Sequence, residues 1–183
     1  SPPTILADIC SVKVRPLKQM LEQYSGPVVG THPLFGPEPD AQTALRTAVV
    51  EGRDEQAKEM VQKLLREIGQ EPFSTGAEEH DRCMAFIQGL NFVTSASYIA
   101  ATTQEPAIEN FLTPSFARRL SAARKMLTQD SELFEGLFEA NPFSHEAVRQ
   151  FRSYLNLAAA GELELLVEKA AWWWSEQEKA GGM

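Results

Sequence analysis

The chain has 183 residues, 43% of them hydrophobic and 23% charged, which is ordinary for a globular domain and excludes wholesale disorder and collagen-like structure. Its 25 acidic residues outnumber its 17 basic ones, and the net charge of -8 argues against nucleic acid or an anionic membrane as a partner. No apolar run approaches the ~18 residues that a bilayer span needs. Cys10 and Cys83 stand in no spacing typical of a zinc site or a disulfide scaffold, so we expect no metal and predict a cytoplasmic location.

The first strand candidate lies almost at the start of the sequence. Residues 4–9, Thr-Ile-Leu-Ala-Asp-Ile, are typical of a buried strand whose sheet partners would lie upstream. The sequence opens with Ser1 rather than Met, and no charged and apolar leader follows it. We therefore expect the chain to begin inside a longer protein.

Up to residue 76, strand-like and helix-like stretches alternate, which predicts an α/β sheet with helices packed on its faces. The helix expected at 54–68 has the clearest pattern, with Asp54 as its N-cap and Gly69 at its C-terminal turn. The other predicted elements of this part are a helix at 14–24 and strands at 27–30, 47–51 and 71–74.

After Gly76 the strand signals stop and helical patterns continue to the end of the chain, so we predict a domain boundary there. The fold class is thus α/β followed by all-α. Asp130 is the expected cap of a short helix that Asn141-Pro142 ends, and Gly161 separates the last two helices. Helices are predicted at 77–101, at 114–128 after a Thr113 cap, at 131–140, at 144–160 and at 162–179.

Three consecutive tryptophans, Trp172 to Trp174, stand in the last predicted helix. Successive helix positions turn by ~100°, so the three side chains spread over too wide an arc for one narrow buried stripe. At least one of them is expected at a rim or a subunit interface, and a broad core-facing edge is the alternative.

The setting of His32 suggests a function from the sequence alone. His32 follows the strand predicted at 27–30, and Ser11 follows the strand at 4–9. Ligands of open α/β sheets bind beyond the carboxyl ends of strands, so these two side chains project into one crevice if the strands are neighbours. A serine hydroxyl can there orient an imidazole that titrates near neutral pH. Ordinary loop capping is the alternative.

Several well-known catalytic motifs are missing from the sequence. There is no Gly-x-Ser-x-Gly elbow of a serine hydrolase. There is also no Gly-x-Gly-x-x-Gly turn, P-loop or His-Glu-x-x-His pattern. Nothing in the given sequence therefore predicts a cradle for phosphate.

Three stretches carry a resemblance to a known family: Asp8-Ile-Cys-Ser-Val-Lys13, Gly26-Pro-Val-Val-Gly-Thr-His-Pro-Leu-Phe-Gly-Pro37 and Glu78-Glu-His-Asp-Arg-Cys-Met-Ala-Phe-Ile-Gln88. In this order the chain resembles the later part of a prephenate dehydrogenase, the NAD-dependent enzyme of tyrosine biosynthesis, with the resemblance weakening after about residue 139. It implies that residues 1–76 are the C-terminal half of a Rossmann-type dinucleotide-binding domain, whose glycine-rich turn lies upstream. Residues 77–183 would then be an all-helical dimerisation and substrate-binding domain.

The resemblance also implies roles at the matching positions. His32 matches the catalytic histidine, which accepts the proton of the ring hydroxyl of prephenate as hydride leaves for the nicotinamide and carbon dioxide departs. Ser11 matches the serine that assists it. Ser11, Lys13 and Pro33 are assigned to cofactor binding, and a solvated lysine is the alternative for Lys13.

Substrate binding is assigned to four residues of the helical part. His80 and Gln88 lie eight residues apart on one predicted helix and share a face toward the cleft; for His80, a locally bonded helix start is the alternative. Prephenate is a dicarboxylate, and the family takes an arginine for it from the helix at 114–128. The register lands on Lys125, but we prefer its neighbour Arg124, because a guanidinium binds a carboxylate in a bidentate way. A second departure is the absence of a histidine that relatives carry before Phe92.

We therefore expect an oxidoreductase that converts prephenate to 4-hydroxyphenylpyruvate by oxidative decarboxylation with NAD or NADP, and that acts as a homodimer. One alternative is arogenate dehydrogenase, which shares the chemistry but takes a substrate that bears an amine. The other is a non-catalytic regulatory or interaction module derived from this family.

Overall fold

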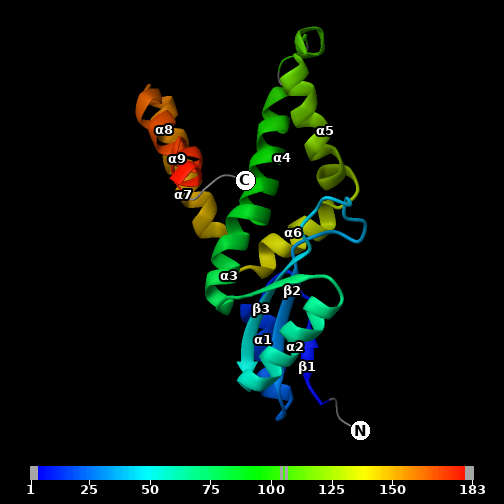
Figure 1. The fold of residues 1–183 in the computed structure, drawn as a ribbon. Coiled ribbons are helices and arrows are strands. Elements are labelled where there is room, and N and C mark those ends of the chain that lie inside the picture. The colour runs from blue at the N-terminus through cyan, green and yellow to red at the C-terminus, as the bar shows by residue number, and fades with distance from the viewer. Residues whose placement is uncertain (1–3, 104, 106, 180–183) are drawn as a thin grey trace. The chain divides into compact units, whose positions relative to one another are not determined.

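A four-stranded sheet lies at the start of the chain (Figure 1). The computed structural model describes residues 4–103, 105 and 107–179. The strands follow one another in chain order, β1 pairing parallel with β2, β2 antiparallel with β3, and β3 parallel with β4. Their bounds are Leu6–Asp8 for β1, Val28–Pro33 for β2, Arg46–Arg53 for β3 and Glu71–Ser74 for β4. All four predicted strands are present.

Strand β2 is longer than the sequence pattern predicts. The expected end at Gly30 is wrong, because pairing with the antiparallel strand β3 continues to Pro33. His32 therefore belongs to the strand, where it lies opposite Ala48. A sheet position holds its backbone more firmly than the loop position that the sequence indicated.

Two helices cover opposite faces of the sheet, because successive side chains of a strand point to opposite sides. Val28 packs with Val50 against Leu17 of helix α1 (Val14–Gln23). Its neighbour Val29 packs with Val49 against Ala57 of helix α2 (Glu55–Glu67). The predicted α/β layering is thereby confirmed.

The predicted signals at the ends of α2 are also confirmed. The side chain of Asp54 accepts hydrogen bonds from the backbone N–H groups of Gln56 (2.9 Å) and Ala57 (3.3 Å). Gly69 follows the helix with φ +84°, a conformation that glycine adopts without strain.

Helices follow the sheet, and α4 and α5 run side by side (Figure 1). The helix expected at 77–101 contains a π-helical stretch, η1, in its middle, within the segment that lacks the histidine of related sequences. The bounds are Ala77–Met84 for α3, Ala85–Leu90 for η1, Asn91–Thr102 for α4, Ile108–Phe111 for the short 3-10 helix η2, Pro114–Thr128 for α5 and Ser131–Ala140 for α6. The all-helical second part is confirmed.

The two predicted N-caps in this region differ in outcome. The Thr113 hydroxyl accepts a hydrogen bond from the Phe116 N–H, as expected. Asp130 occupies the predicted N-cap position of α6, but its side chain makes no hydrogen bond that caps the helix. Its carboxylate lies instead 4.0 Å from the ammonium of Lys125.

The chain forms two compact units, residues 1–144 and 145–183, and the second consists of helices. The bounds are Ser144–Ala159 for α7, Leu163–Ala170 for α8 and Trp172–Lys179 for α9. Gly161 has φ +85° and separates α7 from α8, as predicted. The single helix expected at 162–179 is wrong, because the chain turns at Ala171. The functional boundary expected at residue 76 stays a prediction.

All three tryptophans of α9 have more than half of their surface exposed, which agrees with the expected rim position. The rings of Trp172 and Trp173 meet edge to face, with their centroids 5.3 Å apart. Within the described part of the chain, no helix has both the length and the apolar character that a membrane crossing requires.

Candidate active site

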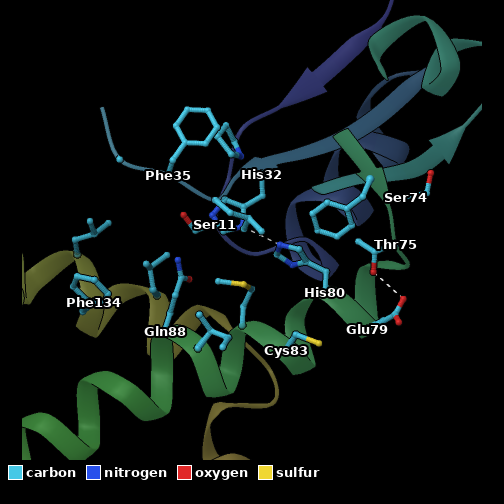
Figure 2. Close-up of a pocket in the computed structure, with 18 residues that line it drawn as sticks. Ser11, His32, Phe35, Ser74, Thr75, Glu79, His80, Cys83, Gln88 and Phe134 are labelled. Atoms are coloured by element: carbon cyan, nitrogen blue, oxygen red, sulfur yellow. Dashed lines mark hydrogen bonds between the residues drawn. The ribbon is translucent and has the colours of Figure 1, made fainter. Parts of the chain in front are cut away.

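A cavity of about 770 Å³ opens in the first unit between the sheet and the helices that follow it (Figure 2). Most of its wall is apolar, with Phe35 and Phe73 contributed from the sheet side and Phe134 from α6. Five of the residues that the sequence analysis assigned to a site line it, namely Ser11, His32, Pro33, His80 and Gln88.

Ser11 and His32 share this cavity because of the strand order. β1 and β2 are parallel neighbours, with Asp8 opposite Gly30, so both chains leave the sheet at the same edge. The predicted convergence of the two side chains is confirmed, and Figure 2 shows them on the same side of the cavity. The roles assigned to them stay predictions.

A chain of hydrogen bonds leads from the cavity into the protein. Nδ1 of His32 lies 2.9 Å from Nε2 of His80, and Nδ1 of His80 lies 2.8 Å from Oδ1 of Asp81. His32 and His80 are each only 4% exposed, and Asp81 is fully buried. Both ring nitrogens of His80 are thus engaged by protein atoms, although its ring still borders the cavity.

Asp81 anchors this chain at the start of another helix. Its carboxylate accepts hydrogen bonds from the backbone N–H groups of Lys13 (2.7 Å) and Val14 (2.8 Å), at the N-terminus of α1. Its own backbone carbonyl accepts a hydrogen bond from the side chain of Asn141 (2.7 Å). No local pattern in the sequence singles out Asp81, although it stands in the Glu-His-Asp stretch, because only the fold brings it to α1.

Lys13 is fully buried, so the solvated alternative for this residue is wrong. Its ammonium donates to both carboxylate oxygens of Asp8 (2.8 and 2.6 Å) and to the backbone carbonyl of Thr31 (2.6 Å), which uses all three of its protons. The stem of Lys13 passes Gly30, where an added Cβ would lie 3.3 Å from its Cδ. Lys13 does not line the cavity, and its assignment to the cofactor stays a prediction.

The electrostatic setting keeps His32 neutral. Burial lowers the pKa of His32 to about 4, and the neighbouring His80 and Lys13 act in the same direction against the opposing charges of Asp8 and Asp81. Near pH 7 the imidazole therefore has an unprotonated nitrogen and can accept a proton from a bound molecule.

The same pKa predicts how stability depends on pH. In the unfolded chain this histidine has an ordinary pKa of ~6.5, whereas in the folded chain it takes up a proton only near pH 4. Between these two pH values the unfolded state binds more protons, so the free energy of unfolding decreases as the pH falls. We expect His32 to lower the free energy of unfolding by about 3 kcal/mol between pH 7 and pH 4. Urea unfolding across this range should show a smaller loss for His32→Gln than for the unchanged protein. Equal losses would contradict the prediction.

Arg124 and Lys125 lie apart from the cavity lining. Both are exposed residues of α5, and among the described residues that line the cavity there is no lysine or arginine. The Lys125 ammonium faces Asp130 at 4.0 Å. Their assignment to a substrate carboxylate stays a prediction.

Curated proteins with similar sequences are longer than this chain. The chain is 28% identical to the T-protein of Enterobacter agglomerans over 80% of its length, 32% identical to that of Haemophilus influenzae over 71%, and 29% identical to a probable arogenate/prephenate dehydrogenase of Methanocaldococcus jannaschii over 75%. It spans 40%, 36% and 33% of these proteins, respectively. No family model matches the chain.

Solved structures share the fold over nearly the whole chain. Arogenate dehydrogenase of Synechocystis superposes with a TM-score of 0.77 at 17% identity, covering 99% of this chain and 71% of the other. Prephenate dehydrogenase of Aquifex aeolicus, in complex with hydroxyphenyl propionate and NAD+, gives a TM-score of 0.71 at 16% identity, covering 96% and 66%.

The chain thus combines an α/β sheet that leads into helices with a histidine-lined cavity where they meet, and solved arogenate and prephenate dehydrogenases share this fold. The sequence similarity to the T-proteins and the fold shared with the solved dehydrogenases both support the predicted resemblance to the prephenate dehydrogenases. The predicted resemblance is confirmed.

Proposed function

We propose that the complete protein is an oxidoreductase that converts prephenate to 4-hydroxyphenylpyruvate by NAD- or NADP-dependent oxidative decarboxylation. The observation that carries the proposal is His32, a neutral imidazole on an apolar cavity with one ring nitrogen engaged by His80. An apolar wall with few polar groups suits a ring-shaped substrate and strengthens the hydrogen bonds made inside it.

In this reaction His32 moves the proton of the substrate's ring hydroxyl. Its free ring nitrogen accepts that proton while the hydroxyl carbon becomes a carbonyl. A bound NAD or NADP would supply the acceptor for the hydride that leaves the same carbon. Loss of the ring carboxylate as carbon dioxide leaves an electron pair that makes the ring aromatic and the oxygen a phenolate. His32 then returns its proton to that oxygen, so the histidine ends the cycle neutral.

The cavity residues fit the reactive end of a dinucleotide. Ser11 and Pro33 border the cavity beside His32, at the carboxyl ends of two parallel strands, where open α/β sheets bind such ligands. We therefore assign Ser11 and Pro33 to the nicotinamide side of the cavity, and His80 and Gln88 to the side of α3 and η1 that would face the substrate. Arg124 or Lys125 remains our assignment for a substrate carboxylate.

The test is turnover by the complete protein, including the part that precedes residue 1. Prephenate with NAD+ or NADP+ should give 4-hydroxyphenylpyruvate, carbon dioxide and the reduced cofactor. Faster turnover of arogenate than of prephenate would show that the substrate is the amine-bearing one and that the protein is an arogenate dehydrogenase. Absence of turnover with both substrates and both cofactors, in a protein that is folded, would favour the non-catalytic module and overturn the proposal.

We also propose that the helical part forms a homodimer. In the second unit, Leu163, Val167 and the three tryptophans each have more than half of their surface exposed. Monomeric proteins expose apolar side chains singly, so this many large ones in one small unit is typical of an interface. Sedimentation velocity at micromolar concentration should show a dimer, and Trp174→Glu should weaken it. A monomer at these concentrations would contradict the proposal.

A further inference from the structure

We propose that Asp81 is a positioning residue that fixes, through His80, which nitrogen of His32 carries the proton. The consequence for catalysis rests on the proposed function, whereas the proton position itself is a property of the folded protein. The resemblance to the prephenate dehydrogenases implies no role for Asp81.

Hydrogen-bonding groups surround the Asp81 carboxylate. Two of them are backbone N–H groups, of Lys13 and Val14, which can only donate. Each carboxylate oxygen accepts one of these bonds, and Oδ1 also faces Nδ1 of His80 at 2.8 Å. An ionised carboxylate only accepts hydrogen bonds, so the His80 nitrogen that faces it must be a donor. The proton of the His80 ring therefore lies on Nδ1.

The hydrogen bond between His80 and His32 extends this proton arrangement to the cavity. When His80 carries a single proton, on Nδ1, its Nε2 has a lone pair, and that lone pair accepts from Nδ1 of His32 at 2.9 Å. The two rings meet edge to face, with an interplanar angle of 69° and 5.1 Å between their centroids. His32 therefore has its proton on Nδ1 and a bare Nε2. A general base needs this tautomer, because the other one already holds a proton on Nε2.

The buried position of Asp81 makes the arrangement rigid. Asp81 is fully buried, its backbone is tied to Asn141, and its carboxylate joins α3 to the start of α1. The nearby Lys13 ammonium is engaged by Asp8 and does not neutralise Asp81. The Asp81 charge also favours the protonated form of His32, so it stabilises the imidazolium that forms during proton transfer.

The competing explanation is that Asp81 only caps α1. Asp81→Asn and Asn141→Ala separate the two roles. Asp81→Asn replaces a uniform acceptor by one acceptor and one donor, so one α1 amide loses its partner and the proton on His80 is no longer fixed. Asn141→Ala is the matched control, because it removes a buried hydrogen bond to the same residue but leaves the carboxylate in place.

The experiment measures the ring nitrogens of His32 by 15N NMR in the complete protein, with signals assigned by their loss in His32→Gln. In the unchanged protein and in Asn141→Ala we expect a protonated Nδ1 and a bare Nε2. In Asp81→Asn the two nitrogens should become similar through exchange between tautomers. A proton on Nε2 of His32 in the unchanged protein would overturn the proposal without any variant, and so would unchanged signals in Asp81→Asn.

Kinetics add a readout that a purely structural role would not change. Asp81→Asn should lower kcat by about tenfold or more and leave KM within about twofold. The acid limb of its pH profile should move to lower pH, because His32 then faces Lys13, His80 and Asp8 without the charge of Asp81. Equal effects of Asn141→Ala would overturn the proposal. If the NMR result holds but prephenate is not turned over, the proposed function fails while the proton position stands.

Discussion

His32→Asn in the complete protein is expected to lower kcat for prephenate by about 100-fold or more and to leave cofactor affinity nearly unchanged. The asparagine amide can still bond His80, so the cavity wall and the buried chain to Asp81 keep a polar partner. It has no nitrogen that accepts a proton, so the hydroxyl proton of the substrate has no base. Steady-state kinetics together with direct titration of the cofactor separates the two effects.

His145→Asn is the matched control for this prediction, because it makes the same substitution in the second unit of the chain. It should leave kcat within about twofold. Loss of turnover and of cofactor affinity together in His32→Asn would indicate a role in folding. Unchanged turnover in His32→Asn would end the assignment of His32 as the base.

The features that the sequence predicted correctly depend on local patterns. The alternation of strand-like and helix-like stretches predicts the layers of the α/β part, and Asp54 and Gly69 act within one helix turn. The meeting of Ser11 and His32 needed only one assumption about strand neighbours, and that assumption is correct.

The features that could not be predicted depend on contacts between distant segments. Asp81 meets the backbone of Lys13 and Val14 across more than sixty positions of chain, and no local pattern indicates that α3 starts beside α1. The break at Ala171 has neither glycine nor proline to mark it, so the pattern reads as one helix. β2 was predicted too short because its length depends on pairing with β3.

The burial of Lys13 is the sharpest contrast between sequence and structure. A lysine on a loop is usually solvated, and its pattern in the sequence is the same whether it is exposed or buried. Lys13 can be buried because Asp8 supplies a carboxylate at the end of β1 and Thr31 supplies a backbone carbonyl that accepts from its ammonium. Gly30 leaves room for its aliphatic stem. The resemblance marked the position as basic, but the structure shows that its charge is neutralised by Asp8.

Lys13→Met is expected to destabilise the protein by about 3–5 kcal/mol, because it removes one partner of a buried ion pair. Asp8, whose side chain is 11% exposed, would then keep as hydrogen-bond partners the backbone N–H groups of Cys10 (3.3 Å) and Thr31 (3.1 Å) and the Cys10 thiol, none of which carries a positive charge. The Thr31 carbonyl would also lose the donor that Lys13 supplies. Denaturant unfolding at pH 7 measures the change in the free energy of unfolding.

Two further variants show whether the loss comes from an uncompensated buried charge. Lys18→Met removes a lysine of α1 whose exposed ammonium lies 4.0 Å from Glu22, and it should change stability by less than about 0.5 kcal/mol. Adding Asp8→Leu to Lys13→Met should recover much of the loss, because an apolar pair leaves no buried charge without a partner. A loss below about 1 kcal/mol for Lys13→Met, or a double variant no more stable than the single one, would show that the Asp8 carboxylate finds another partner when the ammonium is removed.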